Sequence, residues 1–177
     1  KNSIYLKVAR NYLRFRWLIV YLLGAAPVVH ESFVDSCKCP LKKVSNNEYS
    51  SLGAISHRNG KCGYKNKVDL FPSYNSVNEY IESIDGYIKD EIIESHKELY
   101  SQVRLKPSNT KNFKESLLNE GIKYLEYRTI DINPFEKGGL SLADLRFLQV
   151  FNIYLLTKEE SEFENWQEEA LENQQLI

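Results

Sequence analysis

An acid and a base lie two residues apart in KYLEYRTIDINPF, which spans residues 123–135. The β-branched and aromatic residues of this stretch favour a strand, and residues i and i+2 of a strand point to the same face. Glu126 and Arg128 therefore lie side by side on one face. Either they neutralise each other, or they face a charged ligand in a cleft. From the residues alone, a structural ion pair between them is the favoured interpretation.

A second candidate strand, residues 98–106 (ELYSQVRLK), alternates between apolar and polar side chains. Its polar face includes Lys106 at the far end. If this strand neighbours the predicted strand 122–132, the polar faces of the two join into one patch made of Tyr100, Gln102, Arg104, Tyr124, Glu126 and Arg128.

Such a patch has side chains that suit nucleotide phosphates. An arginine donates two parallel hydrogen bonds from a planar fork, which matches the oxygens of a phosphate group. A carboxylate on a strand suits Mg²⁺, which takes oxygen ligands in octahedral geometry, and strands hold such groups more rigidly than loops do. A nucleotide-phosphate site is therefore the second interpretation of Glu126 and Arg128.

Other catalytic and metal-binding patterns find little support. The sequence has no glycine-rich loop of the G-x-x-x-x-G-K-[ST] or G-x-G-x-x-G type, so an ATP site has to rest on sheet side chains and metal. The three histidines, at positions 30, 57 and 96, lie in unrelated contexts and give no Ser-His-Asp or Cys-His assembly. Cys37, Cys39, Cys62 and His57 could ligate zinc, but paired zinc cysteines usually have two residues between them. Ordinary reduced thiols are favoured.

The first part of the chain has the periodicity of a helix. Residues 4–24 place apolar side chains at three- and four-residue steps and end at Gly24, with Pro27 beyond it. The segment 17–29 also has the basic start, apolar stretch and small residues of a secretory signal. Its apolar run is too short to span a bilayer, and no initiator Met precedes it. A buried helix is therefore favoured over a signal peptide.

Patterns further along the chain define the elements that must position the polar patch. They predict, in order, a loop-rich segment (35–68), a helix with a Ser76–Glu79 capping box (75–93), the strand 98–106, a short helix capped by Thr110 or Asn109 (110–119), the strand 122–132, a helix that starts at Ser141 with Asp144 (141–157) and an acidic, helix-prone tail (158–172). With only two strands, we expect an α+β fold in which helices pack on a partial antiparallel sheet. That sheet needs strands from outside this chain to be complete.

Composition sets further bounds. Of the 177 residues, 42% are apolar and 12% aromatic, so a core can form and global disorder is excluded. The formal net charge of -1 gives no general attraction to nucleic acid or anionic lipid. The sequence starts with Lys1 and contains no Met, so we expect a fragment of a longer protein and a single piece, 1–177, of one domain.

Several stretches, taken in order along nearly the whole chain, resemble bacterial glutamate–cysteine ligase. They are NYLRFRWLIVYLLGAAP (11–27), SHRNGKCGYKN (56–66), ELYSQVR (98–104) and YLEYRTIDINPF (124–135). Two later stretches, LSLADLRFL (140–148) and WQEEALEN (166–173), make the sequence most similar to the ligase module of bifunctional glutathione-synthesising enzymes.

The resemblance implies a fold and a reaction. The fold is that of glutamine synthetase and the guanidino kinases, with an antiparallel curved sheet and helices behind it. The reaction joins L-glutamate to L-cysteine through γ-glutamyl phosphate, with ATP as cosubstrate and Mg²⁺ or Mn²⁺ as the metal. The resemblance also implies a cytoplasmic enzyme without a nucleic-acid or membrane partner, and a possible fused ATP-grasp glutathione synthetase domain.

The resemblance also assigns roles to individual residues. Glu126 would be a Mg²⁺ ligand, and Arg128 would bind the ATP phosphates and act in catalysis. Arg58 would be catalytic by holding the phosphorylated intermediate and the substrate. Tyr64 and Tyr100 would line the cysteine site and bind its carboxylate.

Departures from the family pattern limit these assignments. Arg104 is a weaker candidate for the same cleft, and His57 and Cys62 stand beside the loop residues where the family has other side chains. The other metal ligands of the family lie in an N-terminal region that this chain lacks, so we expect the isolated chain to be inactive. Two alternatives remain: a noncatalytic binding or scaffold fragment of the same fold, and a secreted or membrane-associated small protein led by residues 1–29.

Overall fold

The structure is a computed structural model of the chain. It describes residues 1–34, 41–50, 55–56, 58–60, 63, 66, 68–160 and 166–174. Several residues singled out in the sequence lie outside these described residues: Tyr64, His57, Cys37, Cys39 and Cys62.

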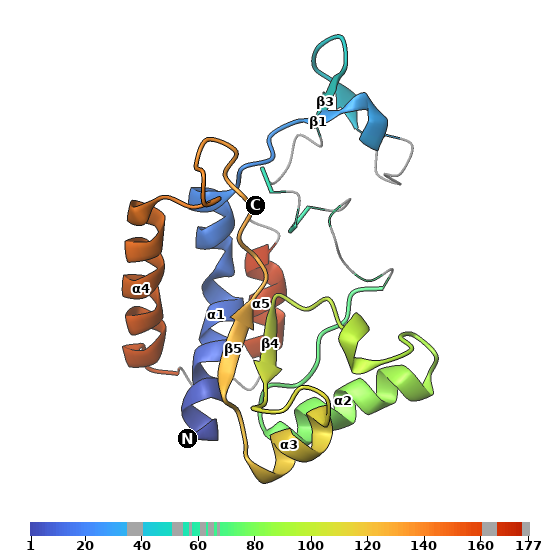
Figure 1. Cartoon of the computed structure of the whole chain (residues 1–177), viewed down its shortest axis with the longest axis vertical. Helices are drawn as coiled ribbons and strands as arrows, with labels where there is room; N and C mark the ends of the chain where they lie inside the picture. Colours follow the sequence, from blue (N-terminus) through green and yellow to red (C-terminus); the bar gives the residue numbers. More distant parts are fainter. Residues whose placement is uncertain are drawn as a thin grey trace. The chain divides into compact units, whose positions relative to one another are not determined.

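Helices and short strands alternate along the chain (Figure 1). In order they are α1 (Asn2–Leu23), β1 (Val29–His30), the 3₁₀ helix η1 (Glu31–Phe33), β2 (Lys42–Lys43), β3 (Glu48–Ser50), α2 (Val77–Lys89), the 3₁₀ helix η2 (His96–Glu98), β4 (Val103–Lys106), α3 (Phe113–Asn119), β5 (Tyr124–Tyr127), α4 (Leu142–Thr157) and α5 (Trp166–Gln174).

The chain forms two compact units. The first unit comprises Lys1–Leu13, Lys65–Arg128 and Asn152–Trp166, and the second comprises Arg14–Tyr64, Thr129–Phe151 and Gln167–Ile177. The first unit contains the antiparallel pair β4–β5, and the second contains a small antiparallel sheet in the order β1-β3-β2. The α+β class and the antiparallel pairing expected from the sequence are confirmed for the described residues.

Helix α1 confirms the buried helix predicted over 4–24. Its buried side chains recur at helical spacing: Leu6, Ala9, Tyr12, Leu13, Ile19 and Val20. The helix ends at Leu23, and Gly24 follows because a side chain does not fit there. A Cβ on Gly24 would lie 2.6 Å from the carbonyl oxygen of Ile55 and 2.6 Å from that of Val20.

The predicted capping residues of two helices are confirmed. At α2, the Ser76 hydroxyl accepts a hydrogen bond from the backbone N–H of Glu79 at 3.1 Å. At α4, the Ser141 hydroxyl accepts from Asp144 N at 3.0 Å, while the Asp144 carboxylate accepts from Ser141 N at 2.8 Å. Each bond satisfies a backbone donor that has no partner inside the helix.

The short helix predicted over 110–119 begins later than expected. Helix α3 starts at Phe113, and neither Thr110 nor Asn109 is its N-cap, which is Asn112. The Asn109 side chain instead accepts from the backbone N–H groups of Lys111 and Asn112, at 3.0 and 3.4 Å. That local turn competes with the first turn of the helix.

Both predicted strands are shorter than the alternation indicated. Instead of 98–106 the strand β4 covers Val103–Lys106, and instead of 122–132 the strand β5 covers Tyr124–Tyr127. The Asn66 side chain explains the first difference, because it donates to Glu98 O at 2.7 Å and accepts from Tyr100 N at 2.8 Å. These backbone groups are therefore bonded to a side chain and not to a neighbouring strand.

Tyrosine hydroxyls occupy the outer edge of β4. The Tyr74 hydroxyl donates to Val103 O, and Leu105 N donates to the Tyr80 hydroxyl at 3.4 Å. Val103 and Leu105 are themselves fully buried, which fixes the inner face of the strand against the core of the first unit. At these two positions the edge of β4 is satisfied without a further strand. Completion of the sheet by strands from outside the chain stays a prediction.

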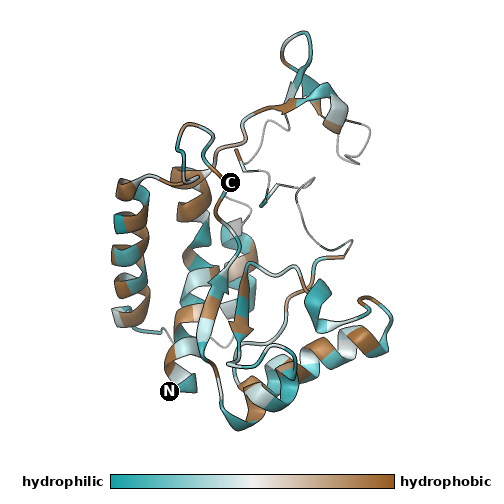
Figure 2. Ribbon diagram, viewed as in Figure 1, coloured by the Kyte–Doolittle hydropathy of each residue, from teal (hydrophilic) through white to brown (hydrophobic). Residues whose placement is uncertain are grey.

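Helix α4 leaves much of its apolar surface exposed. Phe151 and Leu155 are buried, as the predicted apolar face requires, but Leu142 and Val150 are each 64% exposed. Figure 2 shows hydrophobic residues recurring along this helix. Among the described residues, no helix is both long and apolar enough to cross a membrane.

Replacing Gly24 by alanine is expected to destabilise the chain by roughly 1–3 kcal/mol, because the added Cβ meets two backbone oxygens that have little freedom to move. The midpoint of urea denaturation measures this loss. Gly86 in α2 is the matched control: a Cβ there meets nothing within 4 Å, so Gly86→Ala should stabilise the helix by about 0.5–1 kcal/mol. Equal effects of the two substitutions would contradict the close approach at Gly24.

Candidate functional site

The pairing of β4 with β5 brings the predicted polar rows together. Arg104 lies opposite Glu126, and the ladder continues because Arg128 N donates to Gln102 O at 2.9 Å. The condition set by the sequence, that the two strands are neighbours, is therefore met (Figure 1). Tyr127, on the alternate face of β5, holds the strand in place by stacking on Tyr12 of α1, with ring centroids 3.9 Å apart.

Glu126 contacts bases of the opposite strand. Its Oε2 lies 3.0 Å from the Lys106 ammonium nitrogen and 3.8 Å from Arg104 Nε. The sequence alone favoured an ion pair between Glu126 and Arg128. That prediction is wrong, because no such pair occurs among the described residues and Glu126 is paired across the strands instead. Cross-strand neighbours lie about 5 Å apart, whereas residues i and i+2 of one strand lie roughly 7 Å apart.

The carboxylate of Glu126 keeps acceptor capacity for a cation. Its Oε2 is enclosed, and no donor among the described residues gives it a hydrogen bond of good geometry despite the nearby ammonium of Lys106. The side chain as a whole is 38% exposed. An enclosed anionic oxygen of this kind suits a divalent cation. Within the described residues no group of three or more possible metal ligands gathers, so Glu126 alone does not make a metal site there.

Two arginines of the polar face are held by other groups. The guanidinium carbon of Arg128 lies 5.1 Å from the centroid of the Tyr100 ring, which is a cation–π geometry. Arg104 donates to the carbonyl oxygen of His96 at 3.0 Å. A cation–π contact uses none of the N–H groups of Arg128 as hydrogen-bond donors to oxygen, so they can still bind an oxyanion.

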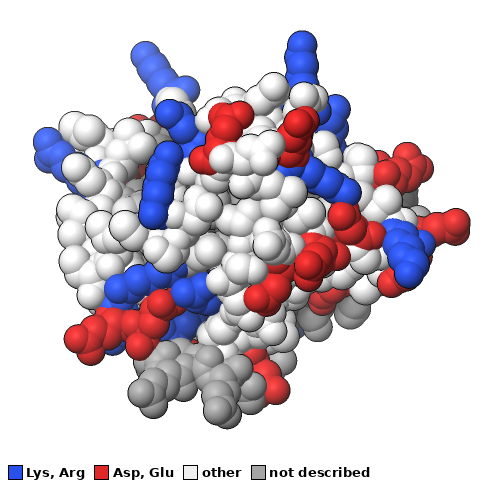
Figure 3. Space-filling view, turned by 90° about the horizontal axis from the view of Figure 1, so that it is seen from below, with Lys and Arg blue, Asp and Glu red and all other residues white. Residues whose placement is uncertain are grey.

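Positive charges lie near His96, and two of them, Arg104 and Lys106, belong to the polar face. Burial lowers the pKa of His96, and the positive charges of Arg104, Lys97, Lys106 and Lys114 lower it further. Acidic and basic side chains are both present on the face of the molecule seen in Figure 3. Three basic residues of the polar face, Arg104, Lys106 and Arg128, accompany one acid, Glu126. This local excess of positive charge departs from the formal net charge of -1 of the whole chain.

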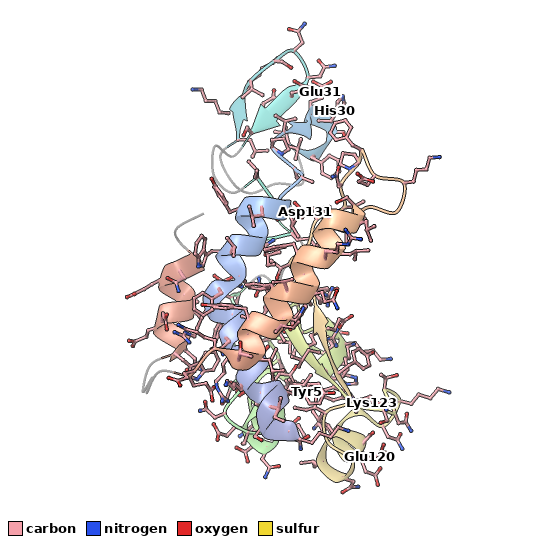
Figure 4. All side chains as sticks on the ribbon, turned by 90° about the vertical axis from the view of Figure 1, so that its left-hand side faces the viewer. Tyr5, His30, Glu31, Glu120, Lys123 and Asp131 are labelled. Carbon is pink, nitrogen blue, oxygen red and sulfur yellow. The ribbon has the colours of Figure 1, made fainter. Side chains whose placement is uncertain are left out.

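Arg58 lies in the second unit, in a turn to which Ser56 and residues 58–60 belong. Its backbone N–H donates to Asp131 Oδ1 at 3.3 Å. Figure 4 shows Asp131 at the C-terminal end of α1, and the part of α1 from Arg14 onward belongs to the same unit as Asp131. The side chain of Arg58 is half-buried.

The structure thus brings together Glu126, Arg128 and Tyr100, along with the weaker candidate Arg104, on the polar face of the first unit. Sequence reasoning missed one member, Lys106, although the alternation already put it on the same face. The register that places its ammonium next to Glu126 could not be seen in the sequence.

Comparison with known proteins decides the family. The family model described as glutamate-cysteine ligase matches residues 1–177. The chain belongs to the glutamate-cysteine ligase family. Two relatives are the "Glutathione biosynthesis bifunctional protein GshAB" of Clostridium perfringens and of Listeria innocua, with 42% and 44% identity over all of this chain. The chain spans 23% of the length of each of these proteins.

Solved structures of the family have the same fold as this chain. A bifunctional glutathione synthetase from Pasteurella multocida superposes with a TM-score of 0.75 and 32% identity, over 98% of this chain and 21% of its own. A glutamate–cysteine ligase from Francisella tularensis, crystallised in complex with AMP, superposes with a TM-score of 0.80 and 25% identity, over 97% of this chain and 40% of its own.

The lowered pKa of His96 predicts a pH dependence of stability. The unfolded chain binds a proton at His96 near pH 6.5, whereas the folded chain binds it only at lower pH. Between these two pKa values the unfolded state holds more protons, so stability falls as the pH drops below about 6.5. Urea denaturation at pH 7.5 and pH 5 measures this, and His96→Gln should remove that part of the loss.

Titration of His96 by NMR gives a second measurement. Lys106→Ala should raise the pKa of His96, because one of the positive charges that depress it is removed. A pKa of 6.5 or higher in the native chain would contradict the electropositive environment.

Proposed function

We propose that this chain forms part of the catalytic domain of an ATP-dependent ligase that joins L-glutamate to L-cysteine. Membership of the family supports the reaction class, and the AMP in the Francisella structure supports nucleotide use. The single observation that carries the proposal is the register of β4 and β5, which gathers three cations and one carboxylate on one face. Because the chain spans under a quarter of its bifunctional relatives, a glutathione synthetase domain on the same polypeptide is part of the proposal.

The proposed reaction has two steps. An oxygen of the glutamate side-chain carboxylate attacks the γ-phosphorus of ATP, which gives γ-glutamyl phosphate and ADP. The amine of cysteine then attacks the acyl carbon, the amide bond forms, and phosphate leaves with the oxygen that came from glutamate. Negative charge spreads over the transferred phosphoryl group in the first step, so fixed cations lower its barrier.

The residues of the polar face have separate roles in this proposal. Arg128 binds phosphate oxygens with its planar fork, while a cation–π contact with the Tyr100 ring limits the movement of its guanidinium. Lys106 and Arg104 hold Glu126 in place and add positive charge. Glu126 would supply one oxygen ligand to a Mg²⁺ or Mn²⁺ ion, whose positive charge would offset the negative charge of the phosphates.

Other assignments follow the resemblance alone. Arg58 would hold the phosphorylated glutamate, and Tyr64 and Tyr100 would bind the carboxylate of cysteine. We also propose that the β4–β5 pair belongs to a larger curved sheet of the glutamine synthetase and guanidino kinase type. The antiparallel pairing of the two strands supports this.

Isotope transfer tests the reaction. The ligase that contains this chain is given glutamate labelled with ¹⁸O in its side-chain carboxylate, ATP and cysteine. Each released phosphate should carry one ¹⁸O atom, and ADP release should depend on glutamate and increase with cysteine. Unlabelled phosphate would contradict the acyl phosphate, and an absence of glutamate-dependent ADP release would favour a noncatalytic fragment.

Substitutions test the roles of the polar face. Glu126→Gln and Arg128→Ala in the same ligase should each lower kcat by about 10²–10³, the usual effect of removing a group that stabilises charge in the transition state. Arg146 is the matched control, because it is an exposed arginine of α4 outside the proposed site; Arg146→Ala should leave kcat unchanged. Wild-type turnover in Arg128→Ala would contradict the phosphate role.

A further inference from the structure

Asp131 is a buried carboxylate that accepts hydrogen bonds from two separate segments of the second unit. It is 7% exposed and lies three residues beyond Arg128. Its Oδ2 accepts from Ala25 N at 3.2 Å, and its Oδ1 accepts from Ser56 Oγ at 3.1 Å and from Arg58 N at 3.3 Å. One side chain therefore joins the end of α1 (Figure 4) to the turn that carries Arg58.

The turn itself has a second attachment to the same segment. The Asn59 side chain donates to Thr129 O at 2.7 Å and to Ser56 Oγ at 2.6 Å, and Gly60 N donates to Ser56 O at 2.9 Å. Ser56, which connects these bonds to Asp131, is 3% exposed. Ser56 and residues 58–60 are thus fixed at two points, the carbonyl of Thr129 and the carboxylate of Asp131.

The path of the chain after α1 reinforces this arrangement. Ala26 N donates to Ile55 O at 3.0 Å, and Gly24 allows that carbonyl to approach within a distance that no side chain permits. The segment that follows α1 is therefore bonded both to Asp131 and to Ile55, the residue just before the turn. Burying a carboxylate costs free energy unless hydrogen-bond donors replace the lost water. Loss of any of the bonds from Ala25, Ser56 and Arg58 would therefore destabilise the buried Asp131.

We propose that Asp131 is a positioning residue for Arg58. Its carboxylate fixes the backbone N–H of Arg58 and, through Ser56, the start of the turn, and so sets the backbone position from which the guanidinium reaches the phosphorylated substrate. This inference deepens the proposed function and rests on it. Asp131 touches no reacting atom itself, and small displacements of a positioned group can cost about 10² in rate.

A double-mutant cycle in the ligase that contains this chain tests the proposal. Asp131→Asn replaces one acceptor oxygen by an NH₂ group, which faces a donor instead of accepting from it. We expect it to lower kcat for glutamate-dependent ADP release by about 10- to 100-fold. In the double variant, Asp131→Asn should lower kcat by no more than about twofold below that of Arg58→Ala alone, because the guanidinium that Asp131 positions is already absent.

Asp144→Asn is the matched control. Asp144 is also a carboxylate of the second unit that accepts a backbone N–H, but it caps α4 and makes no bond to the turn. Asp144→Asn should lower kcat only slightly. In the double variant with Arg58→Ala, the fold-loss in kcat should equal the product of the two single losses. Ser56→Ala is a second variant, in case Asp131→Asn does not fold, and it should couple to Arg58→Ala as Asp131→Asn does.

The outcomes separate the two proposals. If the wild-type ligase shows no glutamate-dependent ADP release, the proposed function fails and the positioning role fails with it. If the wild type and Arg58→Ala behave as proposed but the losses from Asp131→Asn and Arg58→Ala multiply, Asp131 is only structural. Wild-type kcat in folded Asp131→Asn or Ser56→Ala would also overturn the positioning role alone.

Discussion

The antiparallel register of β4 and β5 is the constraint on which the polar face depends. It sets Arg104 opposite Glu126 and brings Lys106 within 3.0 Å of the same carboxylate. A shift by one residue would turn every polar side chain of one strand toward the core. The buried faces prevent this, because Val103 and Leu105 fill the core and the hydroxyls of Tyr74 and Tyr80 bond the edge between them.

The second unit relies more on buried polar interactions. Arg14 makes a two-point ion pair with Glu169, with Nε and Oε2 2.7 Å apart, and its carbonyl accepts from Asn173. These bonds tie α5 to the C-terminal half of α1, much as Asp131 ties the turn that carries Arg58 to the end of that helix. Buried ion pairs of good geometry add little net stability, but breaking one leaves an unpaired charge in the interior.

Local patterns predicted the helices well and the strands less well. Helices α1, α2 and α4 follow apolar spacing and capping residues that lie within a few positions of one another, so the sequence displays their causes. The strand predicted from residue 98 begins instead at Val103, because the side chain of Asn66 bonds the intervening backbone. That interaction spans more than thirty residues, and no local pattern signals it.

The candidate site shows the same division. Alternation placed Glu126 and Arg128 on one face, but the partner of Glu126 was decided by the register, which brought Lys106 to it. Asp131 was not selected, since a single acid in an apolar stretch gives no sign that three distant donors converge on it. Residue types gave the chemistry, whereas long-range pairing determined which groups meet.

The most direct measurement is a crystal structure of the ligase that contains this chain, with Mn²⁺ and a non-hydrolysable ATP analogue bound. Anomalous scattering locates the Mn²⁺ ions. We expect a Glu126 oxygen to coordinate one Mn²⁺ ion directly, and the Arg128 guanidinium to donate to a phosphate oxygen. Nucleotide and metal bound elsewhere, with Glu126 still held only by Lys106 and Arg104, would contradict the role given to this face.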